Sequence, residues 1–442
     1  MDVGQVLQDI EAYIGNQAGD MGRHTWRKTL KDLGVLQEKA KVDEVLDALR
    51  EACKRLSVLT GREKAERMGK FLRKYVRALQ VIENAKEHDL SEVIKSHLDV
   101  IGMFIAIGRL EEAKKFCKMG EDAALQLHGT DRDIALSRIY RRLAYVHRQA
   151  SEYDSALKYY EACIEHAKSA GNVYEIAMGY GGLGYVYWRK GMHREALKNY
   201  DMSKEYGEKI ADAKKRMLGL GTLHIEYGNV YLDLNMEDKA IEHCKKAIEY
   251  LEKIKNLEEL ARVYNNLARV YEEKGEYESA IEYYKKSTKT ADRAGVKFMK
   301  GWALFNLANT YITMYFERGR KEYLENAGKC IKESVKLVDM YDNRLAKGRA
   351  RNVLGRYYAA LKRYEEAKRV FDEALAILGG LGTPDYAAMA YRDLGEMYMM
   401  WGRVENALEA LEKAKTLFES TGNSAKVDEV NALIASCRSM KQ

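Results

Sequence analysis

The chain has 442 residues, 46% of them hydrophobic and 32% charged, and its 74 Lys and Arg against 67 Asp and Glu leave a net charge of +7. This composition can bury a core and excludes a globally disordered chain, while the single proline, Pro384, excludes collagen and proline-rich linkers. No run of about 18 uncharged apolar residues predicts a membrane span, and residues 1–9 do not read as a signal peptide.

Residues 1–92 show helical patterns but no repeat. Apolar residues recur with helical spacing over residues 3–14, 42–59 and 65–85, which predicts a helical N-terminal module over residues 1–92. Residues 62–77 carry seven Lys and Arg, opposed by Glu63 and Glu66. Such a run can meet nucleic acid, an acidic protein or a membrane surface. We favour an exposed helix face whose apolar stripe packs on the rest of the chain. That stripe is Met68, Leu72, Val76 and Leu79.

From about residue 93 the sequence repeats itself. A small residue, called the anchor below, is followed three positions later by an aromatic residue or a histidine and twelve positions later by an alanine. The anchors are about 40 residues apart, with two longer gaps. They are Ala144, Gly184, Gly228, Ala268, Gly355 and Gly395.

Each repeat reads as two helices joined by a turn. Apolar residues at i, i+3 and i+4 predict a helical stripe, and the small anchor and alanine let two helix backbones approach closely. Four positions after the alanine stands a large apolar residue or a cysteine, for example Tyr200. The position seven residues after the anchor suits a left-handed residue that ends the first helix. It holds Gly191, Asn235, Gly275 and Gly402 in four repeats. Since neither helix can bury its stripe alone, neighbouring repeats must stack.

This pattern resembles the tetratricopeptide repeat (TPR) family, and the resemblance covers roughly residues 93–420. It implies an all-α fold, a right-handed α-solenoid of stacked antiparallel helix pairs. The period here is about 40 rather than the usual 34, and the proline near the end of each repeat is missing. Both features resemble the long-repeat branch, which includes Pins-like scaffolds, kinesin light chains and bacterial Rap-type peptide receptors.

We expect about seven to eight repeats. In a seventh, Ala308 and Tyr311 are present, but the alanine comes seven residues late, at Ala327, close to two helical turns. The inserted residues, 315–326, can touch a partner or be a tolerated loop. A weaker repeat precedes the others, at Ile101, Phe104, Gly108, Ala113 and Cys117. The predicted domains are the N-terminal module (1–92), the TPR array (93–420) and a capping helix (421–442) that covers the last apolar face.

No motif assembles a catalytic, cofactor or metal site. Residues 179–184 match G-x-G-x-x-G, but no strand precedes them, so we interpret these glycines as close helix packing. Residues 379–384 read as a loop between repeats rather than a phosphate-binding loop. The nine histidines are scattered, His147 suits a core or boundary position, and the six cysteines contain no C-x-x-C pair. Reduced cysteines in helical stripes indicate a cytoplasmic protein. We expect no enzyme activity, no cofactor and no metal.

The first helices carry the candidate binding surface. In the family that the chain resembles, first helices line a concave groove, at positions six and three residues before the anchor and one and four after it. Here that column holds eight arginines and four asparagines against two glutamates and no lysine. Arginine matches carboxylates, asparagine matches a peptide backbone, and tryptophan supplies anchor pockets. The candidate peptide-binding residues are Arg138, Arg141, Tyr145, Arg148, Tyr185, Trp188, Asn229, Asn265, Arg269, Trp302, Asn309, Arg349, Asn352 and Arg356.

These observations predict a non-enzymatic scaffold that binds a protein or peptide, with an acidic or extended segment in the groove. The first alternative is a Rap-like peptide-sensing regulator whose N-terminal module acts on another protein. The second is that the arginines simply pair with glutamates of adjacent repeats. We do not expect a nucleic acid as partner, because the positive charge is spread over a large surface and is not gathered in one stripe. We expect no membrane partner, because no membrane span is predicted. The sequence does not indicate an oligomeric state.

Overall fold

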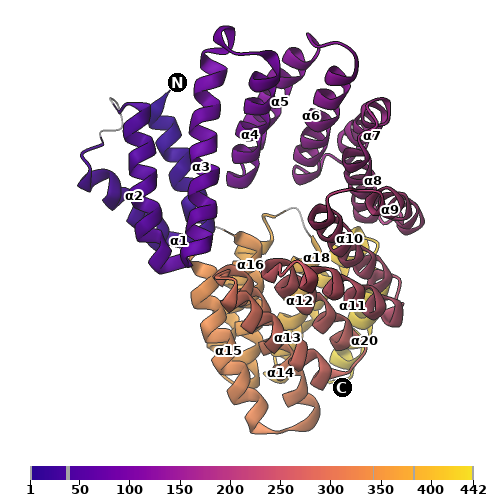
Figure 1. Ribbon diagram of the computed structural model, residues 1–442. Coiled ribbons are helices and arrows are strands. Elements are labelled where there is room, and N and C mark those ends of the chain that lie inside the picture. The colour runs from indigo at the N-terminus through magenta and orange to yellow at the C-terminus, as the bar shows by residue number, and fades with distance from the viewer. Residues whose placement is uncertain (1, 36–39, 342, 382–383, 441–442) are drawn as a thin grey trace. The chain divides into compact units, whose positions relative to one another are not determined.

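The computed structural model describes residues 2–35, 40–341, 343–381 and 384–440. Within these residues the regular structure is entirely helical, with twenty α-helices and one short 3-10 helix (Figure 1). This confirms the predicted all-α fold. The chain forms two compact units, residues 1–266 and 267–442, called the N-terminal and the C-terminal unit below and described one at a time.

The N-terminal unit starts with three long helices and continues as helix pairs. The 3-10 helix, Ala85–Glu87, separates α3 from α4. The helices are α1 (Val3–Asp32), α2 (Val42–Thr60), α3 (Arg62–Glu83), α4 (Leu90–Ile107), α5 (Leu110–Ala124), α6 (Gly129–Gln149), α7 (Tyr153–Ser169), α8 (Val173–Arg189), α9 (His193–Glu208), α10 (Ala213–Asp233) and α11 (Glu237–Lys253). The boundary between the units falls inside α12 (Leu257–Glu273).

The C-terminal unit continues the same pattern. Its helices are α13 (Tyr277–Arg293), α14 (Lys297–Arg318), α15 (Lys321–Asp339), α16 (Arg344–Ala360), α17 (Tyr364–Leu378), α18 (Pro384–Met400), α19 (Val404–Ser420) and α20 (Ser424–Ser439). In both units the two helices of a repeat pack against each other, as α6 with α7 and α10 with α11 (Figure 1), and as α18 with α19. This is the stacked-pair solenoid that the repeats predict.

The turn inside each repeat depends on one left-handed residue. The four positions predicted to end the first helix, Gly191, Asn235, Gly275 and Gly402, have φ values of 73°, 54°, 76° and 74°. Ser151 and Lys362 occupy the same position in two further repeats, with φ values of 61° and 58°. The left-handed turn therefore also forms at residue types that do not favour it, because the packing of the two helices imposes it.

The anchors pack as predicted. A Cβ built on Gly184 would lie 2.4 Å from the ring of Tyr200, and one on Gly355 would lie 2.9 Å from the ring of Phe371. In both repeats the contacted residue stands sixteen positions after the anchor, on the second helix. The aromatic residue three positions after the anchor also contacts the second helix of the repeat. Tyr271, for example, stacks on Tyr283 with ring centroids 5.4 Å apart. The two helices of these repeats can therefore approach closely because the anchor glycine has no side chain.

The repeat with the late alanine forms the pair of α14 and α15. Ala308 and Ala327 are both fully buried, so the inserted residues preserve the buried face. The insertion lengthens the end of α14 and the start of α15, and Phe316, near the end of α14, is 47% exposed.

The first three helices lie where the sequence predicts them, although α1 is longer than predicted. It continues to Asp32 across a break at Gly19, where φ is 69° and ψ is −164°. At the other end, α20 buries Val430, Ile434 and Cys437 against the preceding pair. The predicted domain limits at residues 92 and 420 stay a prediction. Of the loop predicted over residues 379–384, residues 379–381 follow α17, Pro384 begins α18, and residues 382 and 383 lie outside the described residues.

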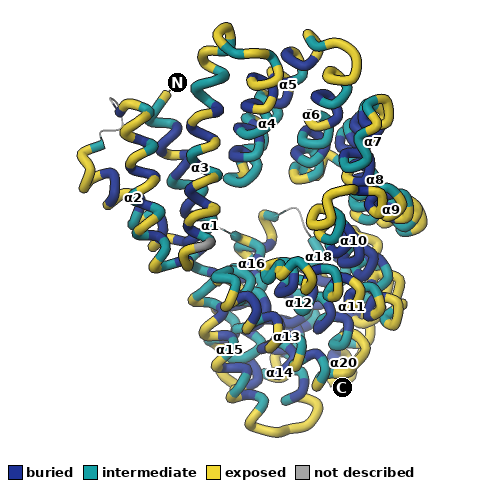
Figure 2. The backbone as a smooth tube through the Cα atoms, in the orientation of Figure 1, coloured by how far each residue is buried: buried dark blue, intermediate teal, exposed yellow. Residues whose placement is uncertain are grey.

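First helices of successive repeats lie closer together than second helices. Helix α6 contacts α8, α14 contacts α16, and α16 contacts α18, whereas no two second helices within the described residues make a comparable contact. Side chains on neighbouring first helices can therefore meet. Along helices such as α2 and α3, buried and exposed positions alternate as the helix turns (Figure 2).

All six cysteines are free thiols, and Cys117, Cys163, Cys244 and Cys437 are buried. Across the described ranges, no helix combines the length and the apolar character needed to cross a bilayer.

Candidate functional site

Polar side chains link the first helices of the N-terminal unit. Arg141 on α6 is paired with Glu175 on α8, whose side chain is only 4% exposed. Burial lowers the pKa of Arg141, but the Glu175 carboxylate outweighs it and holds that pKa above its ordinary value. One turn before Arg141 on the same helix, Arg138 is exposed. Arg141 is therefore neutralised within the protein, as the glutamate-pairing alternative predicts.

Arg148 on α6 is held by aromatic rings instead. Its guanidinium lies 4.4 Å from the ring centroid of Tyr145 and 4.2 Å from that of Tyr185 on α8. Its Nε is buried and has no hydrogen-bond partner in the described structure. A guanidinium stacked between two tyrosines keeps its charge, because an aromatic face stabilises a cation without neutralising it.

The remaining predicted residues of the N-terminal unit contact their neighbours. Trp188 donates from Nε1 to Asp233, at 2.6 Å. Asn229 donates to Glu226 at 3.2 Å and accepts from Asn266 at 3.2 Å. Asn265 is half-buried on α12. Trp188, predicted as an anchor pocket, is thus already bonded to the next first helix.

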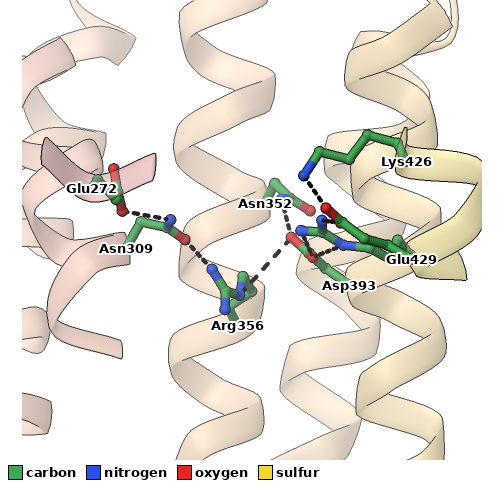
Figure 3. A network of polar contacts seen from close by, with 8 residues as sticks. Glu272, Asn309, Asn352, Arg356, Asp393, Lys426 and Glu429 are labelled. Atoms are coloured by element: carbon green, nitrogen blue, oxygen red, sulfur yellow. Dashed lines mark hydrogen bonds and ion pairs between the residues drawn. The ribbon is translucent and has the colours of Figure 1, made fainter. Parts of the chain in front are cut away.

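In the C-terminal unit a continuous polar network crosses the first helices (Figure 3). Asn309 on α14 donates to Glu272 on α12, at 3.5 Å, and accepts from Arg356 on α16. The Nε of Arg356 lies 4.0 Å from Asp393 on α18. The network therefore runs from α12 through α14 and α16 to α18.

Asp393 is the centre of this network. It is 3% exposed, accepts from Asn352 at 2.7 Å, and pairs with Arg392 at 2.8 Å. Arg392 also reaches Glu429 on α20, at 3.5 Å, and Glu429 pairs with Lys426 at 2.7 Å (Figure 3). Burial raises the pKa of Asp393, but the charges of Arg392 and Arg356 outweigh it and hold this pKa below its ordinary value. Asp393 is therefore a buried carboxylate that fixes two arginines.

Glu272, at the other end, is half-buried and forms no ion pair within the described residues. It accepts hydrogen bonds from the hydroxyls of Tyr284, at 2.8 Å, and Thr310, at 2.9 Å. Burial raises the pKa of Glu272 above its ordinary value, and these hydrogen bonds only partly oppose the effect. The neutral acid is therefore favoured here more than in water.

Arg349 on α16 lies among three aromatic rings. Its guanidinium is 5.2 Å from the ring centroid of Trp302, 5.0 Å from that of Phe305 and 5.2 Å from that of Tyr386. It donates to the side-chain oxygen of Asn306 at 3.4 Å. Burial lowers the pKa of Arg349, since charge is costly in this apolar setting.

These residues surround a cavity of about 50 Å³ in the C-terminal unit. The cavity is lined by Asn306, Asn309, Arg349, Asn352, Val353, Arg356, Leu378, Tyr386, Met389, Arg392 and Asp393. The structure thus gathers four candidate residues from two first helices, Asn309, Arg349, Asn352 and Arg356, around one space. Trp302 contacts Arg349 beside it, and Arg269 is half-buried on α12. Whether these side chains bind a partner stays a prediction.

Comparison with known families supports the repeat pattern directly. The tetratricopeptide repeat model matches residues 135–209 and 219–293, which contain four of the anchors. The chain contains tetratricopeptide repeats. A second model, the C-terminal domain of suppressor of spindle checkpoint defect 1, matches residues 316–426. No curated protein matches the chain.

Solved structures with similar folds support the TPR assignment. Aspartyl phosphate phosphatase F from Bacillus subtilis has 11% identity and a TM-score of 0.54, with 94% of each chain covered. The apo form of the quorum sensor NprR from B. thuringiensis has 16% identity and a TM-score of 0.56, covering 86% of this chain and all of that one. A Rap protein complexed with competence and sporulation factor has 14% identity and a TM-score of 0.52, covering 90% and 98%. At these identities the likeness shows the fold.

One position of the repeat that shapes this surface is absent from the predicted column. The residue two before the anchor supplies Glu226, Asn266, Asn306 and Asp393, each of which contacts a first-helix side chain of another repeat. The signal was available, because four of the seven repeats carry an amide or a carboxylate there. The four predicted positions in each repeat contain the arginines and asparagines, but not the carboxylates and amides two residues before the anchor that contact them.

The remaining sequence motifs of this TPR protein are structural. The glycines of residues 179–184 lie inside α8, where a Cβ on Gly182 would lie 2.2 Å from the ring of Tyr160, so they serve close helix packing as predicted. In the basic segment of α3, Met68, Leu72 and Val76 are buried, so its apolar stripe packs as predicted. His147 stacks on Tyr159 at 5.2 Å. Among the described residues no group of His, Cys, Asp and Glu could hold a metal.

Proposed function

We propose that this TPR protein is a non-enzymatic scaffold that binds a protein or peptide segment of acidic or extended character on its first-helix face. The cavity in the C-terminal unit carries this proposal, because Arg349 lines it with a positive charge that no carboxylate within the described residues neutralises. Arginine and asparagine side chains that converge on one space suit the carboxylates and the backbone of a peptide.

The similar folds are consistent with this choice of partner. One of them is a Rap protein complexed with competence and sporulation factor, and another is a quorum sensor. The six free thiols suit the reducing cytoplasm in which we propose that the protein acts.

A binding experiment tests the proposal in the C-terminal unit. Fluorescein-labelled octaglutamate and octaglutamine are titrated with the full chain and followed by fluorescence anisotropy. We expect octaglutamate to bind more tightly and its binding to weaken with added salt. Arg349→Ala should weaken octaglutamate binding at least about tenfold, since a charge-assisted hydrogen bond is lost.

A control on the same helix sharpens the experiment. Arg351 on α16 pairs with Asp339 at 2.8 Å and does not line the cavity, so Arg351→Ala should leave peptide binding unchanged. Equal binding of the two peptides by the wild type would contradict the preference for acidic segments. Unchanged binding by Arg349→Ala would remove the cavity from the proposal.

A second candidate function is a peptide-sensing regulator whose N-terminal module, residues 1–92, acts on another protein. The similar folds of aspartyl phosphate phosphatase F and the quorum sensor favour it. In a solenoid, small rotations at each repeat add up, so occupancy of one repeat can alter the whole array. Small-angle scattering with and without octaglutamate distinguishes the two, because a regulator of this kind should change its radius of gyration and a static scaffold should not.

A further inference from the structure

The repeat with the late alanine extends beyond its neighbours at the turn between α14 and α15. Helix α14 ends ten residues after its anchor, Ala308, whereas α8 and α16 end five residues after theirs. The five additional residues lengthen the helix by about 7.5 Å. Helix α15 likewise begins six residues before its alanine, Ala327, whereas α9 and α17 begin three residues before theirs. The inserted residues therefore form a helical tip, residues 315–323, which is drawn in orange at the lower edge of Figure 1.

Contacts within the C-terminal unit hold the tip in place. Arg318 forms an ion pair with Glu278 on α13, and the next residue, Gly319, closes the turn with a φ of 69°. Tyr323 on α15 stacks on Tyr311 of α14, with ring centroids 6.3 Å apart. A segment that is ordered in advance loses little conformational entropy when it binds a partner. The tip is therefore better suited to present side chains to a partner than a flexible loop of the same length.

Phe316 is the one exposed aromatic side chain of the tip and of the whole described structure. The sequence has 8 Phe, 4 Trp and 31 Tyr, all within the described residues, and every other one is buried or half-buried. Phe316 is 47% exposed, and its ring centroid lies 5.7 Å from that of Tyr315, which is half-buried. Aromatic side chains that enter a pocket of a partner supply much of the binding energy at protein interfaces. Phe316 is therefore the residue of the tip that is best placed to anchor a partner.

Two cations beside Phe316 indicate the charge of the partner. Arg320 and Lys321 are exposed, and neither forms an ion pair within the described residues. With the adjacent Glu322, residues 319–322 carry a net charge of +1. This rim favours a partner with carboxylates, because opposite charges across an interface steer association and like charges oppose it.

We propose that the tip binds a protein segment that carries apolar side chains flanked by carboxylates. Phe316 contacts the apolar side chains, and Arg320 and Lys321 face the carboxylates. An amphipathic helix with leucine on one face and glutamate beside it has this chemistry, because a large side chain can enter the hollow between four residues of a facing helix. None of the residues that line the cavity belongs to the tip, so this inference goes beyond the proposed function and does not rest on it.

Fluorescence anisotropy with the full chain tests the inference. The probe is a fluorescein-labelled helical peptide with leucine on one face and glutamate on the other. Three control peptides carry glutamine in place of glutamate, lysine in place of glutamate, or alanine in place of leucine. We expect the probe to bind at least about tenfold more tightly than each control. Phe316→Ala should weaken its binding at least about tenfold. Arg320→Gln combined with Lys321→Gln should weaken it about three- to tenfold and lower its salt dependence.

Matched variants separate the tip from the rest of the surface. Val58→Ala removes an apolar side chain that is 87% exposed on α2, and Lys332→Gln combined with Lys336→Gln removes two exposed cations from α15. Both should leave probe binding unchanged. Because the proposed function also predicts glutamate binding at the cavity, each titration is repeated with Arg349→Ala, where binding that depends on Phe316 should persist. Thermal unfolding of Phe316→Ala should lie close to that of the wild type, since the side chain is exposed.

Four results would overturn the inference. The first is a probe that binds no more tightly than the glutamine or the lysine peptide, and the second is unchanged binding in Phe316→Ala. The third is a wild-type dimer in sedimentation velocity that Phe316→Ala dissociates, which would assign the tip to a second copy of the chain. The fourth is binding of phosphatidylserine vesicles that Phe316→Ala abolishes, which would assign it to a membrane surface. If octaglutamate binds while the probe does not, only this inference fails, whereas the reverse result removes the proposed function.

Discussion

Arg141 in the N-terminal unit and Arg349 in the C-terminal unit both lie on first helices but meet different neighbours. In the N-terminal unit Arg141 is paired with Glu175, whose side chain is 4% exposed, so the charge is consumed inside the protein. In the C-terminal unit Arg349 lies among aromatic rings and lines a cavity. One repeat pattern therefore yields an ion pair in one place and, in another, an arginine that has no carboxylate partner within the described residues. Arg141 meets a carboxylate on the neighbouring first helix, whereas Arg349 meets aromatic rings.

The largest expected effect comes from breaking the ion pair between Arg141 and Glu175. Arg141→Ala leaves the buried carboxylate of Glu175 without its cation, which should destabilise the protein by about 3–5 kcal/mol. Urea unfolding followed by circular dichroism measures this loss. Arg138→Ala, at an exposed position one turn away, is the control and should change stability by less than about 0.5 kcal/mol. Similar losses for both variants would mean that the pair is not the cause.

The anchor glycines show whether the units also differ in packing. Gly184→Ala places a Cβ against the ring of Tyr200, and Gly355→Ala places one against Phe371, so each should cost about 1–3 kcal/mol. Gly219→Ala in α10 is the matched control, because its Cβ meets nothing within 4 Å. It should stabilise the protein by up to about 1 kcal/mol, the helix preference for alanine over glycine. Comparable costs at both anchors would place the difference between the units in their polar contacts alone.

A pH series tests the raised pKa of Glu272. The pKa of Glu272 is raised in the folded state, so the wild type loses stability as pH rises from the ordinary value of 4.5 through the raised one. Glu272→Gln keeps the neutral form and lacks this loss. The variant should therefore gain in unfolding free energy relative to the wild type between pH 4 and pH 8, as measured by urea unfolding. A difference that stays constant across this range would contradict the raised pKa.

The smallest expected effect concerns Arg349, which has no carboxylate partner within the described residues. Arg349→Met removes a charge that has no carboxylate partner and retains apolar contact with the surrounding rings. Because the lost cation–π attraction and the relieved cost of burying the charge oppose each other, stability should change by less than about 1 kcal/mol. Thermal unfolding beside Arg141→Met, which should lose several times more, tests the contrast. Equal losses would make Arg349 a structural residue like Arg141.

Much of the fold could be predicted because it depends on spacing. The distance from Gly184 to Tyr200 along the chain sets which residues meet across the pair, and the structure repeats that contact from Gly355 to Phe371. The left-handed turn was recognisable at Gly191 but not at Ser151 or Lys362, where packing imposes it on residues that do not favour it. The length of α1 was missed, because its glycines interrupt the apolar pattern.

The candidate site was less predictable. Arg138 and Arg349 stand at the same position of their repeats, six residues before the anchor, yet one is exposed and the other is packed against Trp302 and Tyr386. The position in the repeat predicts which face of the helix carries a side chain. It does not predict which side chains surround it. Asp393 and Asn306, which shape the cavity, come from the position two residues before the anchor.

The amino-acid sequence by itself determined the stacked helix pairs, because burying an apolar stripe requires only that the stripe recur with the helical period. The tertiary structure decided which arginines are neutralised and where a cavity remains. Ion pairs and hydrogen bonds act over a few ångströms between helices that are about 40 residues apart in the chain, so the identity of each partner depends on how closely neighbouring helices pack.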